Sequence, residues 1–444
     1  MREGTRLRSF LPALLLAALA ALAAPALAAD EMGDLFQAPA AGAAGAGGGA
    51  GGESVTPPTV AGTGSGQGPS LLQQYQNEQK KLSFSWDLTA GGGMYGGLKS
   101  LSGLADPAAN FAYTPAGTLT LTSTVDLRPF DYLRVHESSY VSYPNTAVPG
   151  YDFNLDINSI VWFNELFVDY DLPSGPSVRM GKYGLSWGDA RILGVANLPE
   201  RVINTANLMP SVEVLPSWLE SPTSSIWLKG ALPVGNFSAT GLIGLPSGTY
   251  QGLSVLPYGF LAEYTAGKSY LGLSGLYEED RTPRTALMLK TSRWNIDFYV
   301  DSCLAFSSLA GVVPSAVGGI YYAPATGPDI KLTAELCWNG EPVSGLVQDA
   351  LEICGGLSHA MAIAWSSVGG TNLTIGGTWY QSWSDGSGAL VPALSYSIAP
   401  GVSLKGVFPF VYGPANGYYV RNPPAEANGY ALGGALMIVL KQSF

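Results

Sequence analysis

The fold class follows from the stretch Ile330-Lys331-Leu332-Thr333-Ala334-Glu335-Leu336-Cys337-Trp338, which alternates apolar with polar side chains. Consecutive side chains of a β-strand point to opposite faces, so the pattern predicts a strand with one apolar and one polar face. The same alternation occurs at 82–89, 119–127 and 296–304. A helix would scatter the charged residues around its surface, whereas here they keep one parity. The segment 82–444 is therefore expected to be all-β.

Composition indicates which solvent the apolar face meets. Apolar residues make up 47% of the 444-residue chain and charged residues 12%, whereas a typical soluble domain carries about 25% charged residues. Beyond the N-terminal segment, no stretch has the roughly 18 uninterrupted apolar residues that a membrane helix needs. A transmembrane β-barrel reconciles these observations, because it spreads its apolar residues over every second position of many strands. A soluble β-sandwich or propeller, with the apolar face turned inward, is the alternative.

The connections between the predicted strands differ in length. Short turns rich in Gly, Pro, Ser and Asn are expected at 128–131, 173–177, 233–236, 266–269, 292–294, 326–328, 368–371 and 399–401. Most of the intervening connections are longer, namely 96–114, 144–158, 189–223, 307–315, 341–354 and 414–428. Short periplasmic turns and longer outer loops are typical of outer-membrane barrels. With both chain ends in the periplasm, the pattern predicts an antiparallel up-and-down barrel of about 18 strands, or alternatively about 16.

The N-terminal part of the chain is expected to lie outside the barrel. Basic residues precede a short Leu/Ala run that ends at Ala26-Leu27-Ala28, so residues 1–28 are expected to be a secretory signal peptide. A membrane anchor is the alternative for this segment. Residues 29–81 are predicted to be a disordered, Gly/Ala-rich periplasmic extension with a short helix at 71–81. The outer-membrane barrel is assigned to residues 82–444.

Net charge limits the classes of partner that the chain can bind, and the cysteine count limits its disulfide bonds. Lys and Arg number 22 against 33 Asp and Glu, a net charge of −11. Removal of the signal peptide takes away three Arg and one Glu, which leaves 19 against 32, or −13. This acidity argues against nucleic acid as a partner. The three cysteines give no disulfide framework because their number is odd, although a bridge between Cys337 and Cys354 is left open.

Two places resemble bacterial outer-membrane porins. Residues 178–188 read Val-Arg-Met-Gly-Lys-Tyr-Gly-Leu-Ser-Trp-Gly, similar to the Arg-x-Gly-Lys…Trp-Gly strand of several porin-like families. The chain ends on Phe444, with Leu440 and Ile438 at the same parity, which resembles the insertion signal read by the barrel-assembly machinery; Gln442 departs from the usual apolar or aromatic residue. The resemblance implies a bacterial outer-membrane location, with membrane lipid, the assembly machinery and small solutes as partners, and it allows a homo-oligomer.

If the strand parity holds, one set of charged side chains must face the inside of the barrel. A charge facing lipid would cost about 2–4 kcal/mol near the midplane. A barrel of about 18 strands leaves a lumen too wide for side chains alone to fill. These residues are therefore expected to line a water-filled pore, with an internal salt-bridge lattice and plug as the alternative. They are Asp87, Asp126, Arg134, Glu165, Asp169, Asp171, Arg179, Lys229, Glu263, Glu278, Lys290, Asp297, Asp301, Lys331, Glu335 and Lys405.

The connection 189–223 is the longest predicted loop and the third on its side. In general porins the third loop folds inward and narrows the channel, so the resemblance implies the same here; a position over the rim is the alternative. Rings of fixed charge at a narrow point set ion preference. The candidate constriction residues are Asp189, Arg191, Glu200, Arg201, Glu213 and Glu220.

Aromatic side chains lie near many predicted strand ends, Trp227 and Tyr270 among them. Amphipathic rings favour the headgroup zone of a membrane, so these residues are expected to form aromatic girdles. Stacking against sugar solutes is the alternative role.

Catalysis is not expected. The chain has only two histidines, His136 and His359, and their polar sequence neighbours point to the opposite strand face. No nucleophile elbow, zinc-binding helix, metal-spaced cysteines or phosphate-binding glycine loop occurs, so no catalytic residue, cofactor or metal is predicted. The sequence predicts a porin-like channel for passive diffusion of small polar solutes or ions. A hatch-gated transporter of apolar solutes, similar to fatty-acid channels, is the alternative, ahead of a barrel enzyme or an adhesin.

Overall fold

The computed structural model describes residues 82–98, 110–146, 161–172, 175–199, 226–245, 256–278, 281–324, 326–341, 353–422 and 431–443. Several predictions fall outside these residues: the signal peptide, the N-terminal extension, the terminal Phe444, and the constriction candidates Glu200, Arg201, Glu213 and Glu220. Among the described residues, no helix is long and apolar enough to cross a membrane.

Antiparallel strands make up nearly all the regular structure of the described residues. In chain order they are β1 (Leu82–Leu98), β2 (Ala112–Phe130), β3 (Leu133–Thr146), β4 (Val161–Asp171), β5 (Ser177–Lys182), β6 (Ile226–Val234), β7 (Phe237–Leu245), β8 (Tyr258–Ala266), β9 (Ser269–Tyr277), β10 (Arg284–Arg293), β11 (Ile296–Ser307), β12 (Gly311–Tyr322), β13 (Asp329–Asn339), β14 (Gly356–Ser366), β15 (Leu373–Ser382), β16 (Gly388–Ala399), β17 (Val402–Val407), β18 (Phe410–Tyr412) and β19 (Leu432–Ser443). Short helices, η6 (Val368–Gly370) and α5 (Tyr418–Arg421), lie in the connections.

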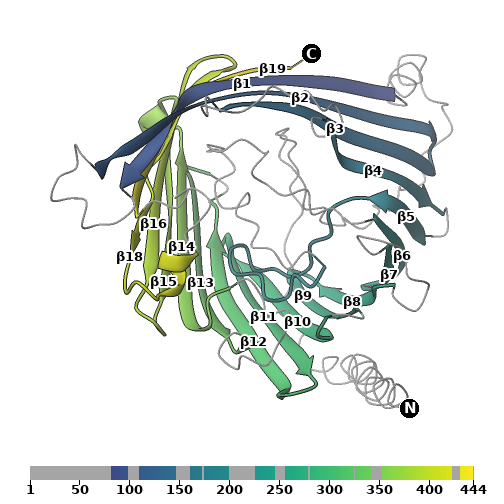
Figure 1. Ribbon diagram of the computed structural model, residues 1–444. Helices are drawn as coiled ribbons and strands as arrows, with labels where there is room; N and C mark the ends of the chain where they lie inside the picture. Colours follow the sequence, from purple (N-terminus) through teal and green to yellow (C-terminus); the bar gives the residue numbers. More distant parts are fainter. Residues whose placement is uncertain are drawn as a thin grey trace.

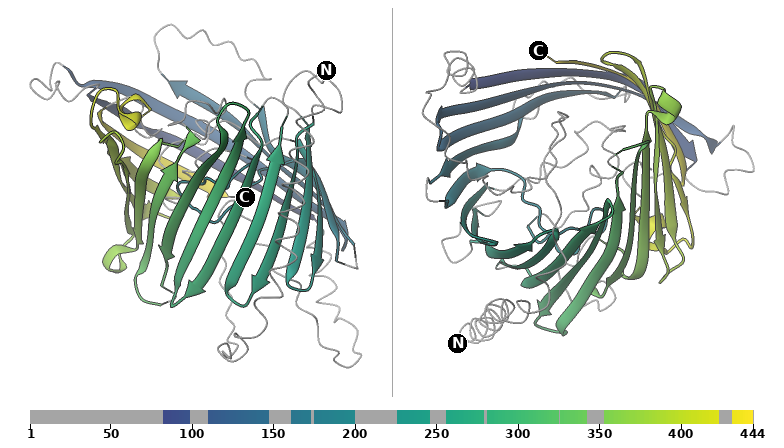
Figure 2. Two further views of the ribbon diagram at one scale, coloured as in Figure 1. Left: turned by 90° about the horizontal axis from the view of Figure 1, so that it is seen from below. Right: turned by 180° about the vertical axis from the view of Figure 1, so that it is seen from behind.

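The sheet closes on itself, because β1 pairs with both β2 and β19 (Figure 1). β17 and β18 form one interrupted strand, since each pairs with β16 and with β19. The nineteen strand segments of the described residues therefore make an antiparallel barrel of eighteen strands, as predicted. The interruption includes Pro409, which has no N–H to donate to a neighbouring strand. Figure 2 shows the strands inclined to the barrel axis, as closure of a sheet requires.

Side chains alternate between the two faces of the wall as the sequence predicts. In β13, Leu336 and Trp338 are 54% and 49% exposed on the outer face, whereas Glu335 and Cys337 are 3% and 0% exposed on the inner face. Large apolar side chains are exposed in the same way on strands all round the barrel, among them Leu119, Leu121, Leu289, Phe298, Ile320, Leu332, Met361, Ile363, Leu436, Ile438 and Leu440. The apolar face is thus outermost, the reverse of a soluble sandwich.

Tight turns lie within the short connections that the sequence predicts, for example at 131–132, 235–236, 267–268 and 294–295. In the β10–β11 turn, Trp294 and Asn295 have φ of 54° and 63°. Two successive residues with positive φ are the mark of a type I′ hairpin turn, whose twist matches that of the flanking strands.

The longer loop predicted at 307–315 is wrong. β11 ends at Ser307 and β12 begins at Gly311, so only three residues connect them. The Ser307 hydroxyl accepts hydrogen bonds from two backbone N–H groups of this turn, at 3.2 Å each. Gly311 has a φ of 74°, which glycine adopts without steric cost. A serine cap and one glycine therefore replace the expected loop.

Candidate functional site

The chain enters the barrel immediately after β5. Residues 183–198, here called the docked segment, run inside the ring of strands (Figure 1). Tyr183, Leu185 and Trp187 are buried and alternate with exposed small residues. From Ile192 to Leu198 almost every side chain is buried. Residues 189–198, in the described part of the predicted third loop, thus lie inside the barrel, whereas a narrowing of the channel by this loop stays a prediction.

The docked segment packs on inward-facing apolar side chains of the wall. Trp227 on β6, Leu242 on β7, Leu276 on β9 and Met288 on β10 are buried in one continuous cluster with it. Gly259 makes room on β8, where a side-chain carbon would come within 3.2 Å of the Trp187 ring. Burial of each large apolar side chain in such a contact is worth about 1.5–3 kcal/mol. This apolar bed keeps the segment against the wall.

The bed corrects one part of the aromatic prediction. Trp227 is 6% exposed and belongs to the inner cluster, so it is not a girdle residue. Tyr270 is likewise not a girdle residue, because its hydroxyl donates to Glu263, one of the predicted inward-facing carboxylates, at 3.0 Å. Trp86, Trp338 and Trp379, which also lie near predicted strand ends, are exposed, and their place at the headgroup zone stays a prediction.

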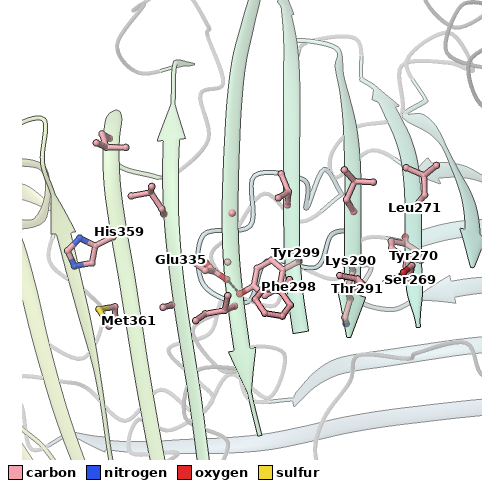
Figure 3. Close-up of a pocket in the computed structure, with 18 of the residues that line it drawn as sticks. Ser269, Tyr270, Leu271, Lys290, Thr291, Phe298, Tyr299, Glu335, His359 and Met361 are labelled. Atoms are coloured by element: carbon pink, nitrogen blue, oxygen red, sulfur yellow. Dashed lines mark hydrogen bonds between the residues drawn. The ribbon is translucent and has the colours of Figure 1, made fainter. Parts of the chain in front are cut away.

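Two buried carboxylates of the wall hold the backbone of the docked segment. Glu335 on β13 accepts hydrogen bonds from the N–H groups of three consecutive residues, 191, 192 and 193, at 2.6–3.2 Å. The Tyr299 hydroxyl donates to the same carboxylate at 2.6 Å, as Figure 3 shows. Asp301 on β11 accepts from the N–H groups of Asp189 and Ala190, at 2.8 Å each. Charge-assisted bonds of this kind offset the cost of burying a carboxylate.

These contacts change the role expected for Asp301 and Glu335. Both carboxylates face the inside of the barrel, as their parity predicts, but they are 0% and 3% exposed. The docked segment covers them, so they do not line an open lumen. Their observed role is to anchor the segment.

The open side of the docked segment carries charged groups. Asp189 pairs with Lys290 of β10 at 3.3 Å, and Lys290 also lies 3.6 Å from Asp297 of β11. Arg191 lies 3.7 Å from Asp297, with its guanidinium 3.6 Å from the centre of the Tyr321 ring. Burial raises the pKa of Asp189, and the nearby Lys290 opposes that rise. Predicted constriction residues and predicted pore-lining residues thus meet in one cluster.

A ladder of ion pairs covers the inner face of β2–β5. Arg134 donates to Asp126 at 2.7 Å and lies 3.7 Å from Asp169. Arg179 donates to Asp169 through two nitrogens, at 2.5 and 3.0 Å. The Arg179 guanidinium also lies 4.2 Å from the centre of the Phe167 ring. The alternation of signs across neighbouring strands neutralises these charges while keeping them on one face.

The two histidines lie on different faces of the barrel. His136 joins the ladder, with its nitrogens 3.5 Å from Asp126 and 3.4 Å from Glu165. His359 has the parity of the exposed Leu357 and Met361 on β14, and its Nδ1 accepts from the Trp383 indole N–H at 2.9 Å. The wall separates them, so they form no catalytic pair.

Of the other predicted pore-lining residues, Lys229 adjoins the ladder and the rest lie elsewhere in the barrel. Asp87 accepts from Ser443 at 2.6 Å where β1 meets β19. Lys229 lies beside Arg179 in the β5–β6 register, and Glu278 pairs with Arg281 at 3.2 Å. Asp171 is exposed at the end of β4, whereas Lys331 and Lys405 are half-buried on β13 and β17.

Loops at the opposite end from the tight turns are tied together by buried polar contacts. Arg284 and Glu341 form a bidentate pair at 3.1 and 2.7 Å, with both side chains 0% exposed. Asp385 accepts from Ser387 and from the backbone N–H of Tyr418 at the start of α5. Burial alone would raise the pKa of Asp385, but these hydrogen bonds, led by that of Ser387, lower it below its usual value.

Within the described ranges, no group of three or more His, Cys, Asp or Glu side chains could hold a metal ion. Cys303, Cys337 and Cys354 are buried and free, so the bridge between Cys337 and Cys354 is not formed.

A hollow of about 1170 Å³ along β8–β15 is a poor candidate for a solute site. Most of the residues that line it carry apolar side chains on the outer face, such as Leu289, Ile320 and Leu336. Phe298 and Met361, labelled in Figure 3, belong to the same set. The hollow therefore belongs to the apolar exterior of the wall.

Comparison with known proteins gives likenesses of fold. No protein-family model matches the chain, and no curated protein matches it. Among solved structures, the outer membrane protein OpdK of Pseudomonas aeruginosa is similar at 9% identity and a TM-score of 0.47, over 82% of this chain and 99% of that one. OccK9 (OpdG) of the same organism is similar at 11% and 0.48, over 82% and 98%. OmpF of Salmonella typhi, solved with daunomycin, is similar at 8% and 0.41, over 82% and 97%. At such identities the function is argued from this chain's own residues.

Proposed function

We propose that this chain forms a porin-like channel in the outer membrane of a double-membraned bacterium, where small polar solutes or ions diffuse through it passively. The observation that carries the proposal is the closed barrel with apolar side chains outside and charged side chains inside. An apolar exterior of this kind is stable only against lipid. Closure leaves no unpaired strand edge in the hydrocarbon, where every backbone polar group must be satisfied.

The accessible inner surface favours polar cargo. The charged side chains of the ladder and of the docked segment keep part of their surface open: Arg134 26%, Glu165 34%, Lys290 29% and Arg191 35%. Among the described residues, the apolar side chains of the inner cluster are buried beneath the docked segment or against one another. A solute in the lumen would therefore meet mainly charged groups, which disfavours the alternative of an apolar-solute transporter.

Charges of both signs would face each other across the passage. The ladder on β2–β5 lies on one wall, and the cluster of Asp189, Arg191, Lys290 and Asp297 lies on the docked segment and the strands beneath it. We propose that the docked segment and the remainder of 189–223 form the constriction, with charge rather than bulk setting ion preference. Insertion through Phe444 by the barrel-assembly machinery, and a homo-oligomeric state, belong to the same proposal.

Planar-bilayer recordings of the refolded chain test the channel directly. We expect stepwise ion conductance, and a larger step from a variant that lacks residues 192–216. Circular dichroism on both proteins establishes that the barrel has formed. A barrel that folds but conducts no ions contradicts the channel, and an unchanged step in the deletion variant contradicts the constriction. Liposome swelling with sugars, set against fatty-acid binding, separates polar from apolar cargo.

A further inference from the structure

A second inner feature lies at the turn end of the barrel, below the docked segment. A cavity of about 380 Å³, here called the turn-end niche, opens among the ends of β9–β12. It is lined by Lys268, Ser292, Arg293, Asn295, Asp297, Tyr321 and Ala323. Water occupies about 30 Å³ per molecule, so the niche can hold a small solute or its charged end. The left-handed β10–β11 turn, with Trp294 and Asn295 at positive φ, shapes one side of it.

The niche holds cations that have no acidic partner. Within the described part of the chain, Lys268 and Arg293 make no ion pair, and the Arg293 guanidinium lies 4.2 Å from the centre of the Trp294 ring. Lys331 also makes none there, and its neighbour Leu332 pairs with Tyr322, the residue between Tyr321 and Ala323 of the niche. Unpaired cations gather here although the whole chain carries a net charge of −11.

The acid of the niche is already satisfied. Asp297 accepts from the Ser292 hydroxyl at 2.5 Å and lies within 3.7 Å of both Lys290 and Arg191. Its charge is therefore offset by one hydroxyl donor and two nearby cations before any solute arrives. The groups left to interact with a solute are donors and cations, namely Lys268, Arg293 and the Asn295 amide. A site with spare donors selects a ligand that is negatively charged and rich in acceptors.

We propose that the turn-end niche binds the oxyanion group of a small solute, the chemistry that phosphate and carboxylate share. Cations on two neighbouring turns can approach different oxygens of one such group, and charge-assisted hydrogen bonds of this kind are about twice as strong as neutral ones. The route by which a solute reaches the niche rests on the proposed channel function, but binding itself does not. Short turns are periplasmic in outer-membrane barrels, so the niche would hold an anion at the periplasmic mouth.

Equilibrium binding to the refolded full chain in detergent, at low ionic strength, tests the proposal without using conductance. Isothermal titration would use inorganic phosphate, acetate and glucose as probes. We expect saturable binding of at least one anion and none of glucose. Lys268→Gln combined with Arg293→Gln should weaken anion binding by about tenfold or more. Arg128→Gln is the matched control, because it removes one cation from the same end of the barrel on the β2–β3 side.

Saturation by phosphate alone assigns the niche to phosphate groups, and saturation by both anions assigns it to oxyanions in general. Absence of anion saturation, or an equal loss in the Arg128→Gln control, overturns the proposal. If the chain binds anions but conducts no ions, the proposed channel function is contradicted and the proposed anion site is retained. If the chain conducts ions but binds no anion, the proposed anion site is contradicted and the channel function is retained.

Discussion

Glu335→Gln tests whether the buried carboxylate holds the docked segment in place. The carboxylate accepts from three backbone N–H groups and from the Tyr299 hydroxyl, so four donors converge on two oxygens. The amide of glutamine has nearly the same shape but only one acceptor oxygen, and its NH₂ group would face donors. The substitution therefore removes charge and acceptor capacity while leaving the packing in place.

The expected effect is large. A hydrogen bond to a charged group contributes about 1.5–3 kcal/mol net, and glutamine can satisfy about two of the four donors. Loss of two such bonds destabilises the docked state by about 3 kcal/mol at the lower end of that range. Since 1.4 kcal/mol corresponds to about tenfold, the undocked population should rise roughly 100-fold.

Limited proteolysis measures this population, because cleavage tracks the equilibrium fraction of an opened state when opening is fast. Trypsin cleaves after arginine, and the N–H of Arg191 is itself one of the three that donate to Glu335, directly after the two that donate to Asp301. We expect cleavage after Arg191 to accelerate about 100-fold in Glu335→Gln. Asp329→Asn is the control, because it removes an exposed acid from the same strand. Equal cleavage rates in all three proteins would refute the anchoring role.

Three further predictions concern stability, each measured as guanidinium unfolding of the barrel in lipid vesicles. Arg284→Met should destabilise the barrel by about 3–5 kcal/mol because it removes the guanidinium that pairs bidentately with the buried Glu341 carboxylate; the double variant with Glu341→Leu should recover most of the loss, and no recovery would contradict a paired role. Leu336→Arg should cost about 2–4 kcal/mol on the outer face, whereas Leu309→Arg, in a turn beyond the strand end, should cost clearly less; equal costs would argue against lipid there. Asp385→Asn should destabilise at neutral pH, because a pKa lowered on folding stabilises the barrel above the usual carboxyl pKa of 3.8. That difference should vanish as the pH falls through the folded-state pKa, and a pH-independent difference would contradict it.

Strand parity predicted the wall of the barrel well because the two solvents impose opposite demands on neighbouring residues. On β13, Leu336 and Trp338 face outward while Glu335 and Cys337 face inward, as the alternation requires. A shift of one residue in the pairing of a strand would turn every side chain to the opposite face. A strand whose apolar and polar side chains face the correct solvents therefore excludes such a shift. The strand count followed from the alternation of short and longer connections.

The apolar bed was not predicted, because the pattern assumes water on the inner side. Leu242 and Leu276 lie on β7 and β9, which read FSATGLIGL and SYLGLSGLY. Both strands carry apolar residues at both parities, the composition expected of strands covered on two faces. That signal was available, but it does not name the partner. Only the fold brings the docked segment onto these strands.

Inward parity also leaves the role of a carboxylate undetermined. Glu335 and Lys290 both face inward, yet one is buried under the docked segment and the other keeps 29% of its side chain exposed. What separates them is a contact between residues more than 140 positions apart in the chain. Docking removes water from both carboxylates, and the backbone N–H groups of the segment replace that hydration with charge-assisted hydrogen bonds. The position of the segment is therefore set by the apolar bed together with Asp301 and Glu335, and the charges left open beside it, Arg191 and Lys290, are those that a solute in the proposed channel would meet.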